Sequence, residues 1–178
     1  MLFRSVLSGG GAKGFAHVGV LKVLEEIGIP IDYIAGTSMG AVVGGLYALG
    51  YTTDMIDSLI QVQDWSHLMS DNVYRENIPA SRRNNQSRYV VSLPYDFPFG
   101  DNTGGVTLPA GVYTGQNIYT LFLNSTIGYH HNISFDNLPI PFGCISADVR
   151  TGDEIVMREG NLAEAIRASM AIPGMFTP

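Results

Sequence analysis

The sequence lacks the features that mark several common protein classes. Its 178 residues include one cysteine, Cys144, so no disulfide can form within the chain. Lysine and arginine number 10 against 16 acidic residues, and the net charge of −6 argues against a nucleic-acid partner. No apolar run reaches the roughly 18 residues of a membrane-spanning helix. The first residues do not have the basic segment and apolar run of a signal peptide.

The sequence also lacks the spacing of a metal site. The four histidines have no acidic or cysteine partners at ligand spacing, and we expect the adjacent pair His130-His131 in a surface loop. Cys144 lies in the apolar segment 141–145 without a cationic neighbour, so we expect a buried strand residue, not a catalytic thiol. We therefore expect no metal and no cofactor.

Apolar residues make up 46% of the chain and charged residues 15%, which suits a single globular domain over residues 1–178. Strand-like apolar runs alternate with segments of helical periodicity in the first part of the chain. The predicted elements are a strand at 3–7, a helix at 15–27, a strand at 31–35 and a helix at 41–49. This order implies parallel strands joined by crossover helices, an α/β fold.

The remaining segments carry weaker patterns. Residues 64–88 are mostly polar, and we expect a long surface excursion there. Residues 97–111 are rich in glycine and proline, which predicts an irregular loop. The other predicted elements are a helix at 54–62 capped by Thr52 or Thr53, a strand at 88–93, a helix at 115–125 capped by Thr114, paired strands at 140–148 and 154–158, and a helix at 162–169 capped by Asn161.

The segment Gly36-Thr37-Ser38-Met39-Gly40 lies between a predicted strand and a predicted helix. This is the context of a nucleophile elbow, a turn so tight that the residues two positions either side of the serine nearly collide. Glycine at both positions removes the Cβ clash, and the serine is left exposed in a strained conformation at a helix N-terminus. The plainer alternative is an ordinary turn in which Ser38 caps the helix.

A glycine run, Gly9-Gly10-Gly11-Ala12-Lys13-Gly14, follows the first predicted strand. It fits the pattern of a dinucleotide site, which expects an acidic residue about 20 positions later at the end of the second strand. Asp32 lies near that distance but precedes the apolar part of the strand, and the Ser38 turn occupies the strand's end.

The second interpretation of the glycine run is an oxyanion hole. The amides of Gly10 and Gly11, joined by that of Met39, would bind the carbonyl oxygen of an ester under attack, each contributing roughly 3–4 kcal/mol. Lys13 adds a positive charge near the same place. Because a serine elbow follows within about thirty residues, acyl transfer is the stronger interpretation.

Three stretches resemble the patatin-like phospholipase family: Leu7-Ser-Gly-Gly-Gly-Ala-Lys-Gly14, Ala35-Gly-Thr-Ser-Met-Gly-Ala41 and Ser169-Met-Ala-Ile-Pro-Gly174. The resemblance covers essentially the whole chain. It implies a three-layer α/β/α sandwich with a mainly parallel sheet and hydrolysis of acyl esters of glycerolipids by a Ser–Asp dyad. It also implies phospholipid or another acyl-ester lipid as substrate, taken from a membrane surface. By carry-over, Ser38 is the nucleophile, and the oxyanion element comprises Gly9, Gly10, Gly11, Lys13 and Gly14.

More narrowly, Tyr33–Gly40 and the region from Leu138 look like bacterial patatin domains that are fused to an outer-membrane barrel. That subgroup implies export of the parent protein to the outer membrane or periplasm, and a cytoplasmic location is the alternative.

The sequence departs from the family at the general base. The family's catalytic aspartate stands in an Asp-Gly-Gly or Asp-Gly-Ala motif beyond the Pro-Gly segment, and neither motif occurs in these 178 residues. Arg4-Ser5 also interrupts a strand that should be continuously apolar. We therefore expect a fragment of a longer protein that is nearly inactive by itself. The alternative function is a catalytically incompetent lipid-binding or scaffold domain.

If another residue of this chain supplied the base, the catalytic pair would differ from the Ser–Asp dyad of the family. His17 follows the glycine run, and we expect it to pack or to lie on the helix surface. We expect His67 at the surface as well. Asp148 ends an apolar strand, where we expect it to cap the following turn or to pair with Arg150.

Overall fold

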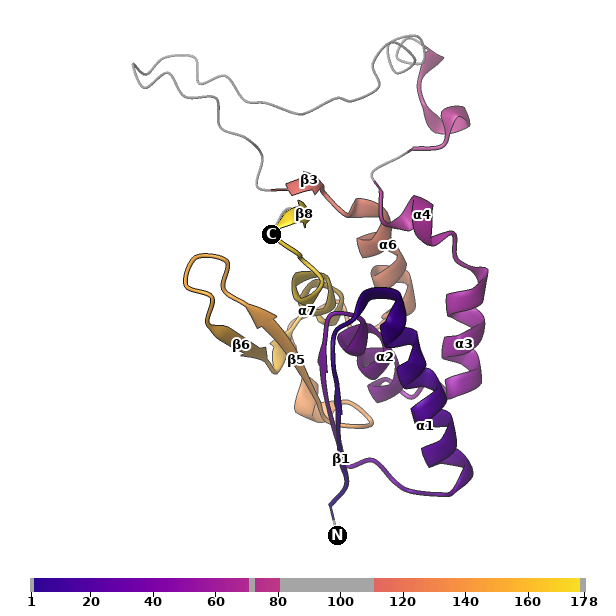
Figure 1. Cartoon of the computed structure of the whole chain (residues 1–178), viewed down its shortest axis with the longest axis vertical. Coiled ribbons are helices and arrows are strands. Elements are labelled where there is room, and N and C mark those ends of the chain that lie inside the picture. Colours follow the sequence, from indigo (N-terminus) through magenta and orange to yellow (C-terminus); the bar gives the residue numbers. More distant parts are fainter. Residues whose placement is uncertain (1, 71–72, 81–110, 177–178) are drawn as a thin grey trace.

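The computed structural model describes residues 2–70, 73–80 and 111–176. The chain alternates between short strands and helices in its first half (Figure 1). In chain order the elements are β1 (Arg4–Leu7), η1 (Gly11–Phe15), α1 (Ala16–Glu26), β2 (Tyr33–Thr37), α2 (Met39–Ala48), α3 (Thr53–Val62), α4 (Trp65–Leu68), η2 (Arg75–Asn77), β3 (Gly111–Tyr113), α6 (Gln116–Ser125), β4 (Ile133–Ser134), η3 (Phe135–Asn137), β5 (Phe142–Ala147), β6 (Glu154–Met157), β7 (Glu159–Gly160), α7 (Leu162–Ser169) and β8 (Gly174–Phe176).

The central sheet has the strand order β1-β2-β5-β6. The first three strands are parallel, and β6 returns antiparallel to β5. Leu7 is in register with Gly36, and Thr37 with Ile145, so the carboxyl ends of β1, β2 and β5 meet at one edge. The predicted α/β class with a mainly parallel sheet is confirmed. Both predicted motifs begin at this edge, because the glycine run follows β1 and Ser38 follows β2.

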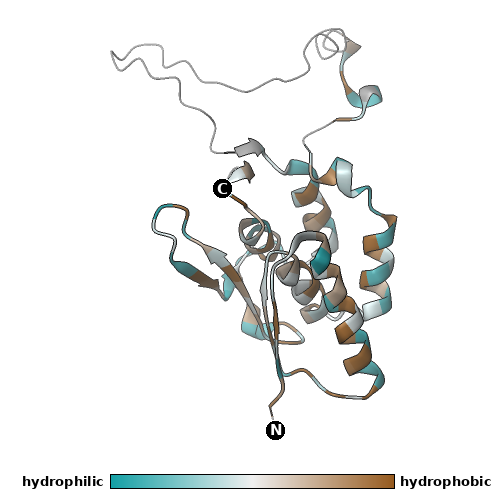
Figure 2. Ribbon diagram, viewed as in Figure 1, coloured by the Kyte–Doolittle hydropathy of each residue, from teal (hydrophilic) through white to brown (hydrophobic). Residues whose placement is uncertain are grey.

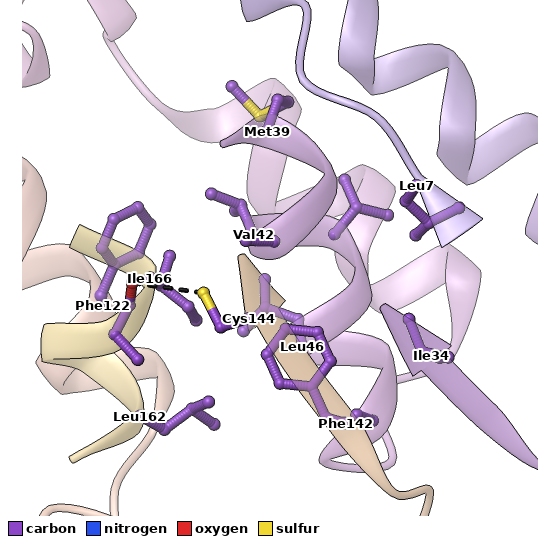
Figure 3. Close-up of a cluster of buried hydrophobic side chains, with 14 of the residues drawn as sticks. Leu7, Ile34, Met39, Val42, Leu46, Phe122, Phe142, Cys144, Leu162 and Ile166 are labelled. Atoms are coloured by element: carbon purple, nitrogen blue, oxygen red, sulfur yellow. Dashed lines mark hydrogen bonds between the residues drawn. The ribbon is translucent and has the colours of Figure 1, made fainter. Parts of the chain in front are cut away.

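Helix α2 lies against the sheet and forms the centre of the core. It contacts β1, β2 and β5, and α7 packs beside it on β5 (Figure 1). Two glycines of α2 permit this approach: a Cβ at Gly44 would lie 2.8 Å from Ile34 Cγ2, and one at Gly45 would lie 3.0 Å from Ile166 Cδ1. Figure 3 shows the apolar side chains of the strands meeting those of α2, α6 and α7.

The interruption of the first strand by Arg4-Ser5 has a simple explanation in the sheet order. Strand β1 is at the edge of the sheet that the described residues form, and only its last residue, Leu7, is buried. Val6 is 75% exposed, and Val20 and Val23 of α1 are 55% and 53% exposed; α1 carries brown bands alternating with teal ones in Figure 2. No helix in the described ranges is long and apolar enough to cross a membrane.

Several predicted boundaries hold, and others need correction. Thr52 caps α3 by accepting from the amide of Met55 (3.3 Å), and Asn161 caps α7, both as predicted. The cap of α6 is Gly115 with φ 70°, not Thr114, because the chain enters this helix through a left-handed turn that favours glycine.

The surface excursion predicted for residues 64–88 is wrong in its first part. Residues 65–68 form α4, and the side chains of Trp65 and Met69 pack against the core. Asp64 caps this helix through its carboxylate, which accepts from the amide of His67 (3.1 Å). The predicted strand at 88–93 and nearly all of the predicted loop at 97–111 lie outside the described residues.

Candidate active site

Ser38 occupies the junction between β2 and α2 in a strained backbone conformation. Its φ of 52° and ψ of −119° make it the one residue other than glycine with positive φ among the described residues. Such a conformation costs about 1–3 kcal/mol, which the surrounding structure must supply. Ser38 stands at the N-cap position of α2, but its hydroxyl forms no capping hydrogen bond with the helix. Ser38 also lines an apolar cavity.

The two glycines that flank Ser38 are required by contacts between backbones. A Cβ at Gly36 would lie 2.4 Å from the carbonyl oxygen of Gly40. A Cβ at Gly40 would lie 2.1 Å from the carbonyl oxygen of Leu7, at the end of β1. Backbone atoms cannot move aside as flexible side chains can, so neither position accepts a larger residue. The glycines thus close the turn and also bring α2 against the neighbouring strand.

The glycine run lies beside Ser38. A Cβ at Gly9 would be 3.2 Å from Ser38 Cβ, and one at Gly14 would be 2.5 Å from Met39 Cβ. Gly11 has φ 55° and begins η1, a 3-10 turn that precedes α1. The sequence pattern predicted a helix directly after the run and missed this turn. Lys13 is exposed on it.

Among the backbone amides near Ser38 that have no protein acceptor within the described ranges are those of Gly10, Gly11 and Met39. The amide of Ser38 itself is occupied, because it donates to the hydroxyl of Ser169 (2.7 Å). These three amides are the donors that the sequence proposed for the oxyanion hole. The N-terminus of α2, where Met39 lies, adds the partial positive charge of aligned peptide dipoles.

An apolar cavity of about 230 Å³ opens beside Ser38. It is lined from both predicted motifs and from three later segments: Gly11, Ala12, Phe15, Ser38, Met39, Trp65, Met69, Met170, Ile172 and Phe176. The rings of Phe15 and Trp65 contact each other at 4.9 Å between centroids. Sequence reasoning missed Trp65 and Met69 as site residues. Trp65 is the one tryptophan of the chain, and its place in a polar segment was the available signal.

No acidic or histidine side chain of the described residues forms a hydrogen bond with the Ser38 hydroxyl. Asp148 takes the predicted structural role, since its carboxylate accepts from the amides of Arg150 (2.7 Å) and Thr151 (3.1 Å). His17 Nε2 donates to the carbonyl oxygen of Ser8 (2.9 Å).

The other histidines lie in other surroundings. His67 stacks on Tyr74 with ring centroids 4.1 Å apart, and His130 Nε2 donates to the carbonyl of Leu123 (2.7 Å). His131 is exposed, as expected for a surface loop. Within the described residues no three histidine, cysteine or acidic side chains gather where they could hold a metal ion.

Cys144 is the buried strand residue that the sequence predicted. Its thiol donates to the carbonyl of Ala165 in α7 at 3.2 Å, the dashed line in Figure 3. Burial raises the pKa of the thiol to about 12, which keeps it neutral at physiological pH. This thiol therefore contributes to packing. Its pKa is raised, whereas the pKa of a catalytic cysteine is lowered.

Comparisons with known proteins show which family this chain is similar to. An NTE family protein of Mycobacterium bovis is 33% identical over 174 residues, which cover 97% of this chain and 24% of that protein. Lysophospholipase NTE1 of Cryptococcus neoformans is 32% identical over 173 residues, 97% of this chain and 9% of that protein. The chain therefore spans a quarter or less of the length of these two relatives.

The fold also matches a solved structure. Full-length ExoU from the type III secretion system of Pseudomonas aeruginosa, in complex with SpcU, has a TM-score of 0.53 at 19% identity. The match covers 95% of this chain and 38% of that one, and it shows the fold alone. The sequence profile described as "Patatin-like phospholipase" matches residues 6–178. The chain belongs to the patatin-like phospholipase family.

Proposed function

We propose that this domain hydrolyses acyl esters of lipids through an acyl-enzyme formed on Ser38. One observation carries the proposal: Ser38, strained and without a side-chain capping bond, borders an apolar cavity that Gly11 and Ala12 of the glycine run also line. A nucleophile, a group of amide donors and an apolar site for the substrate's chain thus adjoin one another. This is the combination that attack on a fatty-acyl carbonyl needs.

In the proposed reaction, Ser38 Oγ attacks the ester carbonyl carbon while its proton passes to a general base. The carbonyl oxygen becomes an oxyanion that the amides of Gly10, Gly11 and Met39 stabilise. The tetrahedral intermediate collapses, the bond to the alcohol breaks, and the alcohol leaves with a proton from the base. Water then attacks the acyl-enzyme in the same manner, releases the fatty acid and restores the Ser38 hydroxyl.

The base in this proposal is an aspartate, as the family resemblance implies. The described residues give Ser38 no carboxylate or imidazole partner, and their Asp148 is committed to a turn. We therefore assign the base to an aspartate other than those that the structure describes, since neither Asp-Gly-Gly nor Asp-Gly-Ala occurs in these 178 residues. The full-length protein is accordingly the form in which activity should be assayed.

The proposed substrate class is glycerolipid with an acyl ester, supplied from a membrane surface. The wall of the cavity is apolar, with three aromatic residues and three methionines, so it suits a hydrocarbon chain. A relative from Cryptococcus neoformans is named a lysophospholipase, which supports phospholipid as the class. Membership of the family supports lipid hydrolysis in general.

Trapping of the nucleophile tests the proposal. Full-length protein is incubated with an alkyl fluorophosphonate and digested, and the modified peptide is sequenced by mass spectrometry. We expect one adduct on Ser38 and none in Ser38→Ala. Ser8→Ala, which changes an exposed serine at the end of β1, is the matched control and should keep the adduct.

The alternative, a domain that binds lipid without hydrolysing it, predicts a different result. It expects lipid binding without an adduct and without ester turnover in the full-length protein. An unlabelled Ser38 together with intact lipid binding would favour that alternative over the hydrolase.

A further inference from the structure

Ser169 lies between two strands of the central sheet at the point where they separate. Its hydroxyl accepts from the amide of Ser38 (2.7 Å) and donates to the carbonyl oxygen of Ile145 (2.5 Å). The first partner follows β2, the second belongs to β5, and Ser169 itself ends α7. One hydroxyl therefore connects the candidate nucleophile, its neighbouring strand and a helix.

The register of the sheet shows what this hydroxyl replaces. In a parallel pair, donor amides of one strand recur every second residue. Ile34 donates to the carbonyl of Pro141 (2.9 Å), so two further steps along the ladder pair the amide of Ser38 with the carbonyl of Ile145. These are the two groups that Ser169 joins. Its hydroxyl occupies the place of the next rung of the β2–β5 ladder.

We propose that Ser169 is a positioning residue for Ser38, a role that rests on the proposed hydrolase function. Because Ser169 inserts one oxygen into the ladder, the chain that follows β2 can diverge from β5 at Ser38 while the Ser38 amide stays hydrogen-bonded. Without that partner the strained backbone of Ser38 would lose a contact that holds it. The same bond removes the Ser38 amide from the set of oxyanion donors and leaves that role to Gly10, Gly11 and Met39.

Two contacts dock the end of α7 so that Ser169 reaches its place. Cys144 donates its thiol proton to the carbonyl of Ala165 (3.2 Å), and Ser146 Oγ donates to the carbonyl of Ala168 (3.3 Å). Both donors lie on β5, one on each side of Ile145 along the chain. Helix α7 is therefore fixed to the strand that carries the second partner of Ser169.

The test compares variants of the full-length protein. Ser169→Ala removes the bridging hydroxyl, and Ser169→Thr keeps it. Ser146→Ala is the matched control, because it removes a hydroxyl bound to the same end of α7 that does not touch Ser38. The rate of fluorophosphonate reaction is measured per reactive site, so that a loss of folded protein does not alter it.

We expect Ser169→Ala to slow labelling of Ser38 ten- to hundredfold, while Ser169→Thr and Ser146→Ala stay within about threefold of the wild type. The half-saturating probe concentration should not change, because Ser169 does not line the apolar cavity. A residue with a merely structural role would lower the folded fraction and leave the rate per site unchanged. Equal rates per site in Ser169→Ala and Ser146→Ala would overturn the assignment.

Amide hydrogen exchange gives a second measurement that does not depend on catalysis. We expect the Ser38 amide to exchange at least about tenfold faster in Ser169→Ala than in Ser146→Ala. Equal exchange in the two variants would also overturn the assignment. If wild-type Ser38 takes no label, the hydrolase proposal fails, and the exchange rates alone decide whether Ser169 holds the Ser38 amide.

Discussion

The backbone amide of Ser38 donates to the hydroxyl of Ser169, 2.7 Å away and 131 positions later in the chain. This bond links the turn between β2 and α2 to the last residue of α7. Because α7 packs on β5 and against α2, the position of Ser38 depends on elements from both ends of the chain. The conformation of the candidate nucleophile is therefore a property of the tertiary structure as well as of its own pentapeptide.

Replacement of Gly40 by alanine should destabilise the fold severely. The added Cβ would lie 2.1 Å from the carbonyl oxygen of Leu7, and both partners are backbone. We expect the free energy of unfolding to fall by about 3 kcal/mol or more in urea denaturation. Gly19→Ala is the matched control: Gly19 lies in α1 with nothing within 4 Å of its Cβ position. There alanine should stabilise the protein by about 0.5–1 kcal/mol. Equal stability of the two variants would show that α2 does not approach β1 so closely.

If the proposed hydrolysis takes place on Ser38, Met69→Trp should shift the ester preference of the full-length protein towards short chains. Met69 lines the apolar cavity, and a larger ring there takes the space of about two methylene groups. At about 0.8 kcal/mol for each methylene, kcat/KM for an octanoyl ester should fall about tenfold relative to that for an acetyl ester. The control, Val62→Trp, changes an exposed residue of α3 that does not line the cavity. An unchanged ratio in Met69→Trp would mean that the acyl chain binds elsewhere.

Cys144 should make the fold less stable at high pH. Burial raises the pKa of this thiol from 9.0 to about 12, so above pH 9 the unfolded chain releases the proton before the folded chain does. The free energy of unfolding should therefore fall as the pH rises from about 9 towards about 12.

The pH dependence of Cys144→Ala provides the check. This variant has lower stability throughout because it leaves a cavity, but it should lose less stability over the same pH range. Parallel pH profiles of the two proteins, measured by urea denaturation, would contradict a buried neutral thiol.

Residues 1–178 by themselves should hydrolyse esters at least about a thousandfold more slowly than the full-length protein, because the family's Asp-Gly-Gly or Asp-Gly-Ala motif does not occur in them. The measurement is turnover of p-nitrophenyl butyrate by both proteins at equal molar concentration. Comparable turnover by the short chain that disappears in Ser38→Ala would show that one of these 178 residues supplies the base. His17 would then be the first candidate to replace.

The local motifs of this protein could be read from the sequence because each depends on neighbours in the chain. Gly36 and Gly40 flank Ser38 within five residues, and their need for a missing Cβ is a local steric matter. The period of the apolar residues likewise predicted the order of strands and helices, and with it the parallel sheet that places both motifs at one edge. For the same reason the caps Thr52 and Asn161 were predictable.

The tertiary structure alone decided which distant residues complete the site. Trp65 and Met69 reach the cavity from a segment whose polar composition predicted a surface excursion. Ser169 enters the β2–β5 ladder only because α7 is docked on β5, and no periodicity in the sequence records that contact. The physical reason is the same in each case: contacts between residues far apart in the chain are selected by packing, whereas the turn at Ser38 is selected by the stereochemistry of a few consecutive residues.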